Sequence, residues 1–160
     1  MRDMNPAPFR VLFVCMGNIC RSPAAEGVMR ALAAKAGVAM HVESAGVIGC
    51  HAGDLPDRRM VAAAKRRGYE LVSRARQVAR GDFNKFDLIL TMDDDNLRGV
   101  LGFADNDGER AKVVRFTNYC RVYQGTTEVP DPYYGGGEGF ERVLDLLEDG
   151  CRGLLETRAK

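Results

Sequence analysis

Residues 14–23 read Val-Cys-Met-Gly-Asn-Ile-Cys-Arg-Ser-Pro and lie between an apolar run and a stretch with helical spacing. The run, residues 10–15, is β-branched and aromatic, which is typical of a strand buried on both faces in a parallel sheet. Ser22-Pro23 predicts a helix start, because proline fits the first helical turn. The helix is expected to end at Gly37, a candidate C-cap. The segment therefore predicts a strand, a tight loop and a helix in direct succession.

The rest of the chain continues this alternation of strands and helices. The further elements expected are strands over residues 40–44, 88–90 and 113–114, and helices over 57–67, from Asp93 and from Phe140 to Leu155. Between them, residues 117–137 have turn chemistry and predict a long loop of the kind that is usually functional or disordered. The alternation predicts an α/β fold, in which helices cover both faces of a parallel sheet.

The composition is typical of one globular domain spanning residues 1–160. Of the 160 residues, 46% are apolar and 28% are charged, which is enough to build a sizeable core. A net charge of +1 does not favour a nucleic-acid partner, and no apolar stretch is long enough to predict a membrane span. Residues 1–9 lack the apolar run of a signal peptide and are expected to form a flexible N-terminal segment.

The chain has five cysteines: Cys15, Cys20, Cys50, Cys120 and Cys151. An odd number without a secretory leader argues against a disulfide framework and favours a reducing, cytoplasmic setting. Cys15 and Cys20 have a spacing that zinc ligands allow, but no second close pair of Cys or His completes a tetrahedral site. We therefore expect neither a metal nor a cofactor.

The loop between the first strand and the first helix has the features of an anion site. Ligands of open α/β sheets bind beyond the carboxyl ends of the strands, and loop N–H groups beside a helix N-terminus bind anions. Gly17 and Asn18 tolerate a positive φ, so the loop can curl with its N–H groups inward.

The side chains of the loop add a nucleophile and a cation to this site. Cys15, beside a helix N-terminus and an arginine, is expected as the reactive thiolate. Arg21, six residues later, can hold two phosphate oxygens at once. Ser22 can donate a hydrogen bond to the thiolate or cap the helix. The pattern predicts a nucleophile at the floor of a phosphate cradle.

This segment resembles the signature of the low-molecular-weight protein tyrosine phosphatases. The likeness covers nearly the whole chain, from Arg10 to about Leu155. Further matching segments are Ser44-Ala45-Gly46, Arg74-Ala75-Arg76, Phe86-Asp87-Leu88-Ile89-Leu90, Met92-Asp93 and Asp131-Pro132-Tyr133-Tyr134-Gly135. The resemblance implies a three-layer sandwich, with a four-stranded parallel sheet, helices on both faces and a phosphate loop after the first strand.

The resemblance also implies an activity and its partners. The activity is hydrolysis of phosphotyrosine and aryl phosphates through a phosphocysteine intermediate, under redox regulation. The implied partner is a phosphotyrosine-containing protein, with a tyrosine kinase among the candidates.

Roles follow for individual residues that match the family. Cys15 matches the nucleophile, Arg21 the phosphate-binding arginine and Asp131 the acid that protonates the leaving phenol and then activates water. Cys20 matches a second loop cysteine that can bridge the nucleophile. The residues implied in substrate or phosphate binding are Met16, Gly17, Asn18, Ile19, Cys20, Ser22, Tyr133 and Tyr134. Asn18, Ser22 and Ser44 match a polar network that holds the loop in shape.

Two positions depart from the family pattern. The network often includes a histidine before the Arg/Lys-Ala-Arg segment, and the matching residue here is Ser73, which is the expected substitute. Many members carry a bulky aromatic after Ser-Ala-Gly, where this chain has Cys50. These departures concern the rigidity of the loop and the choice of substrate.

Other functions use parts of the same pattern. A thiol-dependent arsenate reductase needs a downstream cysteine relay, and residues 91–104 contain no cysteine. A phosphotyrosine-binding module needs neither Cys15 nor Asp131, and a phosphocysteine carrier does not need Arg21. A Cys–His hydrolase needs a base histidine, for which His51 has no supporting pattern.

Overall fold

The sheet of this computed structural model, which describes residues 7–133 and 135–158, has four parallel strands. They are β1 (Phe9–Cys15), β2 (Met40–Gly46), β3 (Leu88–Thr91) and β4 (Val113–Arg115), in the spatial order β2-β1-β3-β4. All neighbouring pairs are parallel, and β1 is central, with Val11 opposite both Val42 and Leu88. The carboxyl ends of the strands therefore meet at one edge of the sheet.

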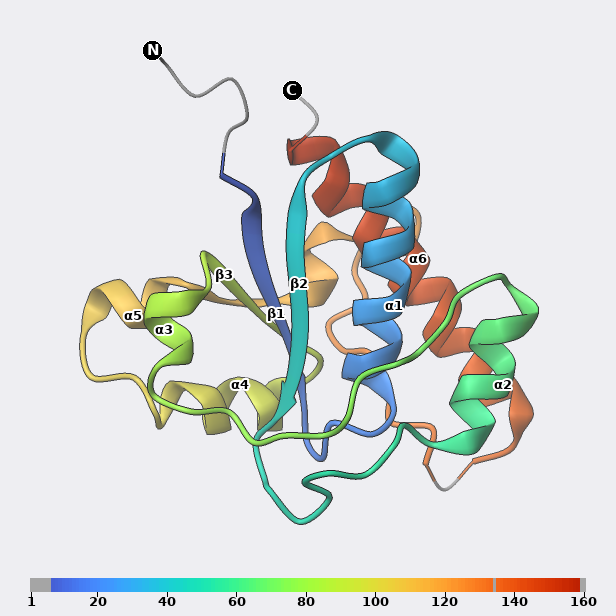
Figure 1. Ribbon diagram of the computed structural model, residues 1–160, viewed down its shortest axis with the longest axis horizontal. Coiled ribbons are helices and arrows are strands. Elements are labelled where there is room, and N and C mark those ends of the chain that lie inside the picture. Colours follow the sequence, from blue (N-terminus) through green and yellow to red (C-terminus); the bar gives the residue numbers. More distant parts are fainter. Residues whose placement is uncertain (1–6, 134, 159–160) are drawn as a thin grey trace.

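Helices cover both faces of this sheet (Figure 1). One face carries α1 (Arg21–Ala36), α2 (Arg58–Arg66) and α6 (Gly137–Arg158), and the other carries α3 (Asp82–Lys85), α4 (Asp94–Leu101) and α5 (Asp107–Ala111). The expected three-layer α/β sandwich with a four-stranded parallel sheet is confirmed. None of the helices in the described part of the chain is both long and apolar enough to cross a membrane.

The alternation of side chains along β1 divides the core in two. Val11 and Phe13 belong to the apolar cluster under α1 and α6, whereas Leu12 and Val14 belong to the cluster under α4. All four are fully buried, because successive residues of a strand point to opposite faces and both faces are covered. The unbroken apolar run of β1 is thus the sequence signature of its central place.

The element boundaries differ from the sequence expectation at several points. Phe9, expected in a flexible N-terminal segment, is the first residue of β1 and pairs with Met40, whereas residues 1–6 lie outside the described part. The short helices α3 and α5 were not expected, because four and five residues carry too little periodicity to recognise. The long loop contains a 3₁₀ turn over Phe116–Tyr119 and ends where α6 begins at Gly137.

The long loop after β4 is attached to α6 and to the end of β3. Gly153 allows a close approach, since a Cβ atom there would lie 1.9 Å from the carbonyl oxygen of Tyr119. The buried Asp149 carboxylate accepts hydrogen bonds from the backbone N–H groups of Arg121, Val122 and Tyr123, at 2.9–3.1 Å. Further on, the N–H of Val129 donates to the carbonyl of Met92 at 2.8 Å. These contacts carry the chain to the carboxyl edge of the sheet.

The Asp149 cradle predicts a pH-dependent stability. Burial raises the pKa of Asp149, but hydrogen bonds from the N–H groups of residues 121–123 lower it by more than burial raises it. The net pKa of Asp149 therefore lies below its usual value. The carboxylate therefore stabilises the fold above the unfolded-state pKa of about 4, and this contribution is lost as pH falls through the folded-state pKa. We expect Asp149→Asn to lower the free energy of unfolding at pH 7 by about 1–3 kcal/mol, because a good acceptor of three N–H groups is lost.

Urea unfolding at pH 7 and near pH 3.5 measures this effect. The difference between wild type and Asp149→Asn should shrink at the lower pH. Asp107→Asn, at a fully exposed carboxylate, is the control and should change little. A difference for Asp149→Asn that is the same at both pH values would contradict the assignment.

Candidate active site

The loop between β1 and α1 lies at the carboxyl edge of the sheet and is shaped by its neighbours. Asn18 has a φ of 60°, the only positive φ of a non-glycine residue within the described part of the chain. Gly46, at the end of β2, makes room for the loop, since a Cβ atom there would lie 2.9 Å from the carbonyl oxygen of Met16. The next two N–H groups, of Val47 and Ile48, donate to the carbonyls of Cys15 and Met16 at 3.0 Å. The end of β2 thus supports the floor of the loop.

The Cys15 thiol lies at the start of this loop and is only 3% exposed. Its Sγ is 3.0 Å from the Oγ of the buried Ser22, in the first turn of α1. Ser22 Oγ accepts a hydrogen bond from Asn18 Nδ2 at 2.8 Å, which leaves its hydroxyl hydrogen for the sulfur at 3.0 Å or for the carbonyl of Ala45 at 3.4 Å. Of the two roles open to Ser22, the structure therefore favours donation to the thiolate, and no side chain caps α1.

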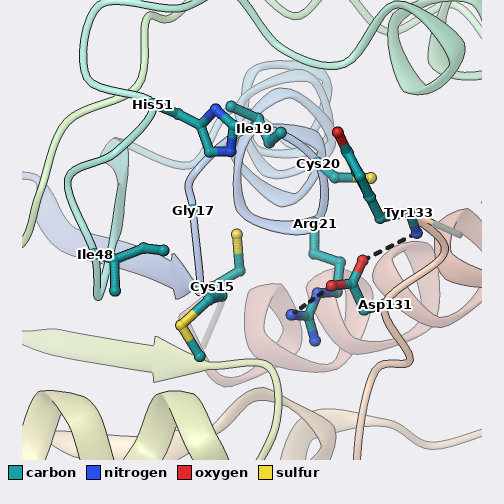
Figure 2. Close-up of a pocket in the computed structure, with 10 residues that line it drawn as sticks. Cys15, Gly17, Ile19, Cys20, Arg21, Ile48, His51, Asp131 and Tyr133 are labelled. Carbon is teal, nitrogen blue, oxygen red and sulfur yellow. Dashed lines mark hydrogen bonds and ion pairs between the residues drawn. The ribbon is translucent and has the colours of Figure 1, made fainter.

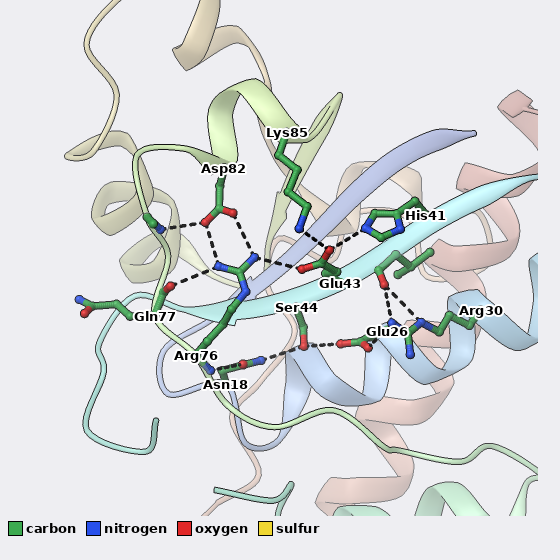
Figure 3. Close-up of polar contacts among 12 residues, drawn as sticks. Asn18, Glu26, Arg30, His41, Glu43, Ser44, Arg76, Gln77, Asp82 and Lys85 are labelled. Atoms are coloured by element: carbon green, nitrogen blue, oxygen red, sulfur yellow. Dashed lines mark hydrogen bonds and ion pairs between the residues drawn. The ribbon is translucent and has the colours of Figure 1, made fainter. Parts of the chain in front are cut away.

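A buried chain of hydrogen bonds continues from Asn18 to a carboxylate (Figure 3). Asn18 Nδ2 also donates to Ser44 Oγ at 2.9 Å, and Ser44 donates to Glu26 Oε1 at 2.6 Å. Glu26 is 3% exposed, and its other oxygen lies 2.9 Å from Arg30. Sequence reasoning missed Glu26, although an acid among the small and apolar residues of the first helix was a usable signal.

The segment after α2 supports Asn18 from the other side. The backbone N–H of Arg76 donates to Asn18 Oδ1 at 3.0 Å, while its guanidinium binds both oxygens of the buried Asp82 and reaches Glu43 (Figure 3). Ser73, the expected substitute for the family histidine, is half-buried and makes no hydrogen bond to the loop within the described part of the chain. Support comes instead from the Arg76 main chain, whose position is fixed by the ion pair with Asp82.

Arg21 is buried at the first position of α1 and is anchored by one edge of its guanidinium. Nη1 donates to Asp93 Oδ2 at 2.7 Å and to the carbonyl of Val129 at 2.9 Å. The Asp93 carboxylate also caps α4, because its other oxygen accepts the N–H of Asn96 at 2.8 Å. Burial lowers the pKa of Arg21, but the charges of Cys15 and Asp93 raise it more, so the net pKa is raised. Arg21 is a permanent cation with a fixed orientation.

These residues line a pocket of about 260 Å³ (Figure 2). Its lining includes Cys15, Arg21, Asp131 and Tyr133, while Tyr134 lies outside the described residues. Asp131 is half exposed at the mouth, with Oδ2 3.7 Å from Arg21 Nη2 and Oδ1 accepting the N–H of Tyr133 at 3.0 Å. The structure thus brings a thiol, a buried cation and an accessible carboxyl group to one small cavity.

The pocket also contains two residues that sequence reasoning did not select. Ile48 and His51, both from the loop after β2, form the wall that faces Tyr133. The His51 ring lies over Gly17, where a Cβ atom would be 2.9 Å from the ring, and its Nδ1 is 3.2 Å from Asp54. Cys50, in contrast, is exposed and is not part of the lining. No sequence spacing links this loop to Cys15, which explains why it was missed.

Comparison with known proteins gives one consistent result. The family model for low molecular weight phosphotyrosine protein phosphatases matches residues 10–160. A Synechocystis protein named as a low molecular weight protein-tyrosine-phosphatase is 50% identical over 153 residues, which cover 94% of this chain and 97% of that protein.

Solved structures have the same fold. A protein tyrosine phosphatase from Entamoeba histolytica superposes with a TM-score of 0.89 at 42% identity, over 93% of this chain and 96% of that one. An arginine phosphatase from Drosophila superposes with a TM-score of 0.85 at 29% identity, over 92% and 96% of the two chains. From the matched residues, the shared fold and the geometry of the loop, this chain belongs to the low molecular weight phosphotyrosine protein phosphatase family.

Proposed function

We propose that this chain is a protein tyrosine phosphatase that hydrolyses phosphotyrosine and aryl phosphates through a phosphocysteine intermediate. The observation that carries the proposal is the Cys15 sulfur in a pocket that also holds the anchored Arg21 and the accessible Asp131. Residues 1–160 act as one phosphatase domain in this proposal, and the reaction needs no metal or cofactor.

In the first step, the phosphate is bound by the loop and attacked by sulfur. The N–H groups of residues 16–20 surround three phosphate oxygens, as loop N–H groups do in anion sites. Because Asp93 and Val129 hold Nη1 of Arg21, its Nε and Nη2 bind two phosphate oxygens, and Nη2 gives up its 3.7 Å contact with Asp131 to do so. The Cys15 thiolate forms a bond to phosphorus, and the bond from phosphorus to the phenol oxygen breaks.

Asp131 provides the proton that the leaving phenol needs. Its carboxyl group lies at the pocket mouth and is 49% exposed, so it can reach both the leaving oxygen and solvent. In the second step, the ionised Asp131 takes a proton from water as the water oxygen bonds to phosphorus. The bond between sulfur and phosphorus breaks, phosphate leaves and the Cys15 thiolate is regenerated. Donation from Ser22 stabilises that thiolate as a leaving group.

The walls of the pocket support an aromatic substrate. Ile19, Ile48 and Tyr133 present apolar surface above the thiol, and Tyr133 is 38% exposed at the rim. A planar phenyl ring fits such a slot, and an aromatic rim residue can stack on it. The proposed partners are phosphotyrosine-containing proteins of the cytoplasm, with tyrosine kinases among the candidates and with no role for nucleic acid or a membrane span.

The first prediction concerns the nucleophile. Cys15→Ser should abolish hydrolysis of an aryl phosphate but leave oxyanion binding largely intact, because a serine hydroxyl is far less ionised than a thiol. Arg21→Lys should also be severe, since a point charge cannot replace a two-oxygen fork. The measurement is phosphate release from phosphotyrosine. Parallel assays measure phosphate release from phosphoarginine and the reduction of arsenate by thiols. Near-normal hydrolysis by Cys15→Ser would refute the assignment, and arsenate turnover without phosphate release would indicate a reductase instead.

A second prediction concerns the general acid. Asp131→Asn should lower kcat on phosphotyrosine by roughly 10²–10⁴, the usual contribution of general acid–base catalysis. The loss should be smaller for esters with acidic phenols, which leave with little protonation. Comparing kcat across a series of aryl phosphates measures this dependence. An equal loss on every ester would mean that Asp131 only shapes the loop.

A third prediction concerns oxidation. Cys15 and Cys20 both line the pocket, and burial together with the Cys15 charge raises the pKa of Cys20. Peroxide converts the Cys15 thiolate to a neutral sulfenic acid, which removes that repulsion. Attack by the Cys20 sulfur then forms a disulfide and releases water.

Reversible protection of Cys15 is the expected outcome. After peroxide treatment and reduction, wild type should recover nearly all activity, whereas Cys20→Ser should recover poorly. Cys50→Ser, at the exposed cysteine, is the control and should recover as wild type does. Equal recovery of all three proteins, or a Cys15–Cys50 bridge in a peptide map, would remove Cys20 from the redox role.

A further inference from the structure

A shallow groove adjoins the active-site pocket along the start of α2. It has a volume of about 740 Å³ and is lined by residues 53–59 and Arg74. Three contacts join its lining to that of the pocket. The N–H of Asp57 donates to the carbonyl of Ile19 at 2.6 Å, Asp54 lies 3.2 Å from His51 Nδ1, and Arg59 donates to the carbonyl of Tyr133 at 3.0 Å. A peptide whose phosphorylated side chain occupies the pocket enters the groove if its backbone leaves the pocket on this side.

Hydrogen bonds hold the backbone on both sides of the groove. Gly53 and Ala75 are paired, since the N–H of Gly53 donates to the carbonyl of Ala75 at 2.8 Å and the N–H of Ala75 donates to the carbonyl of Asp54 at 2.9 Å. On the other side, Asp57 caps α2 by accepting the N–H of Arg59 at 2.8 Å. The side chains of the groove therefore project from a preformed backbone.

The charges of this groove do not cancel. Its two carboxylates already have cationic or hydrogen-bonding partners: Asp57 lies 2.9 Å from Arg59, and Asp54 contacts His51. Within the described residues, Arg74 donates to the carbonyl of Gly53, at 3.0 Å, and to no other group. Arg58 has no carboxylate partner in the described part of the chain. Three arginines and two aspartates thus give the groove a net positive charge, and Arg58 and Arg74 are exposed without an ion pair in the described part of the chain.

An apolar side chain lies among these charges. Leu55 is 60% exposed and lines the same groove, next to the buried Pro56. The groove thus combines two available cations with one apolar contact beside a pocket that takes a phosphorylated side chain. This combination fits a peptide with acidic residues better than a small ester, which ends at the pocket mouth.

We propose that this groove binds the segment next to the phosphotyrosine in a protein substrate and selects acidic side chains, which pair with Arg58 and Arg74. The inference rests on the proposed function, because it names the substrate class of the same site. Both arginines lie outside the pocket that holds Cys15, so they contribute to substrate choice and not to the chemical step.

Matched phosphotyrosine peptides test the proposal. The set contains a neutral peptide with Gln and Asn on both sides of the phosphotyrosine, and peptides with Glu and Asp placed either before or after it. For one of the two acidic peptides, with acidic residues either before or after the phosphotyrosine, wild type should show a higher kcat/KM than for the neutral peptide. The ratio of these two kcat/KM values measures the acidic preference. Arg58→Gln and Arg74→Gln should each reduce that ratio by about two- to five-fold, the range of one exposed ion pair. The double variant should reduce it further, and salt should reduce the ratio of wild type.

Two controls separate this effect from damage to the enzyme. Arg152→Gln, on the exposed side of α6, should keep the preference of wild type. All arginine variants should hydrolyse a small aryl phosphate as wild type does, since that ester does not reach the groove.

The outcomes are distinct. An acidic preference that is absent from wild type, or that survives in the double variant, overturns the inference. An equal loss on acidic and neutral peptides also overturns it, because the arginines would then not distinguish the side chains next to the phosphotyrosine. Failure of wild type to hydrolyse any aryl phosphate would instead refute the proposed function itself.

Discussion

The hydrogen bonds of the Asn18 side chain tie together the segments that build the pocket. Its amide nitrogen donates to Ser22 in α1 and to Ser44 in β2, and its oxygen accepts the backbone N–H of Arg76. The Asn18 side chain is buried, and an unpaired polar group there would cost about 1–3 kcal/mol. The left-handed backbone of Asn18 persists because these bonds hold it, and the curvature of the loop around the Cys15 sulfur depends on that backbone.

The same bonds determine the direction of each hydrogen in the network. Glu26 at its end accepts from Ser44, so Ser44 can receive the Asn18 amide only through its oxygen lone pair. Asn18 must therefore present its nitrogen to both serines, and Ser22 keeps its hydrogen for the Cys15 sulfur at 3.0 Å or the more distant carbonyl of Ala45 at 3.4 Å. A buried acid thus makes Ser22, through two side chains, an acceptor toward Asn18 and leaves its hydroxyl hydrogen available to the nucleophile. The partly exposed guanidinium of Arg30 balances the charge of the buried Glu26 carboxylate.

A second set of contacts brings the acid and the cation together from distant parts of the chain. The Asp149 cradle and the bond from Val129 to Met92 hold the loop after β4, and the carbonyl of Val129 also anchors Arg21. Asp131 follows two residues later and lies near the free edge of the guanidinium. The orientation of the phosphate-binding fork and the position of the acid therefore depend on the same short segment of loop.

The sequence by itself determined the features that depend on neighbouring residues. The apolar run of β1 and the helix start beside Ser22-Pro23 follow from local rules, and they put Cys15 and Arg21 on one loop. Most of the strands and the long helices were also predictable, because each carries its own periodicity. The family signature identified Asp131 as well, but only by resemblance, since an Asp-Pro pair is also a common turn.

Only the tertiary structure decided which distant residues complete the site. Asn18 and Arg76 are 58 residues apart, and Arg21 and Val129 are 108 residues apart. No periodicity connects such pairs, so Arg76 and His51 could not be selected from the sequence. Among the described residues, the loop is supported at this place by the main-chain N–H of Arg76, held by the Arg76–Asp82 ion pair, and not by a hydrogen bond from Ser73. The groove that contains Arg58 and Arg74 was also not predictable from sequence spacing. It forms because backbone hydrogen bonds bring residues 53–54 beside residue 75.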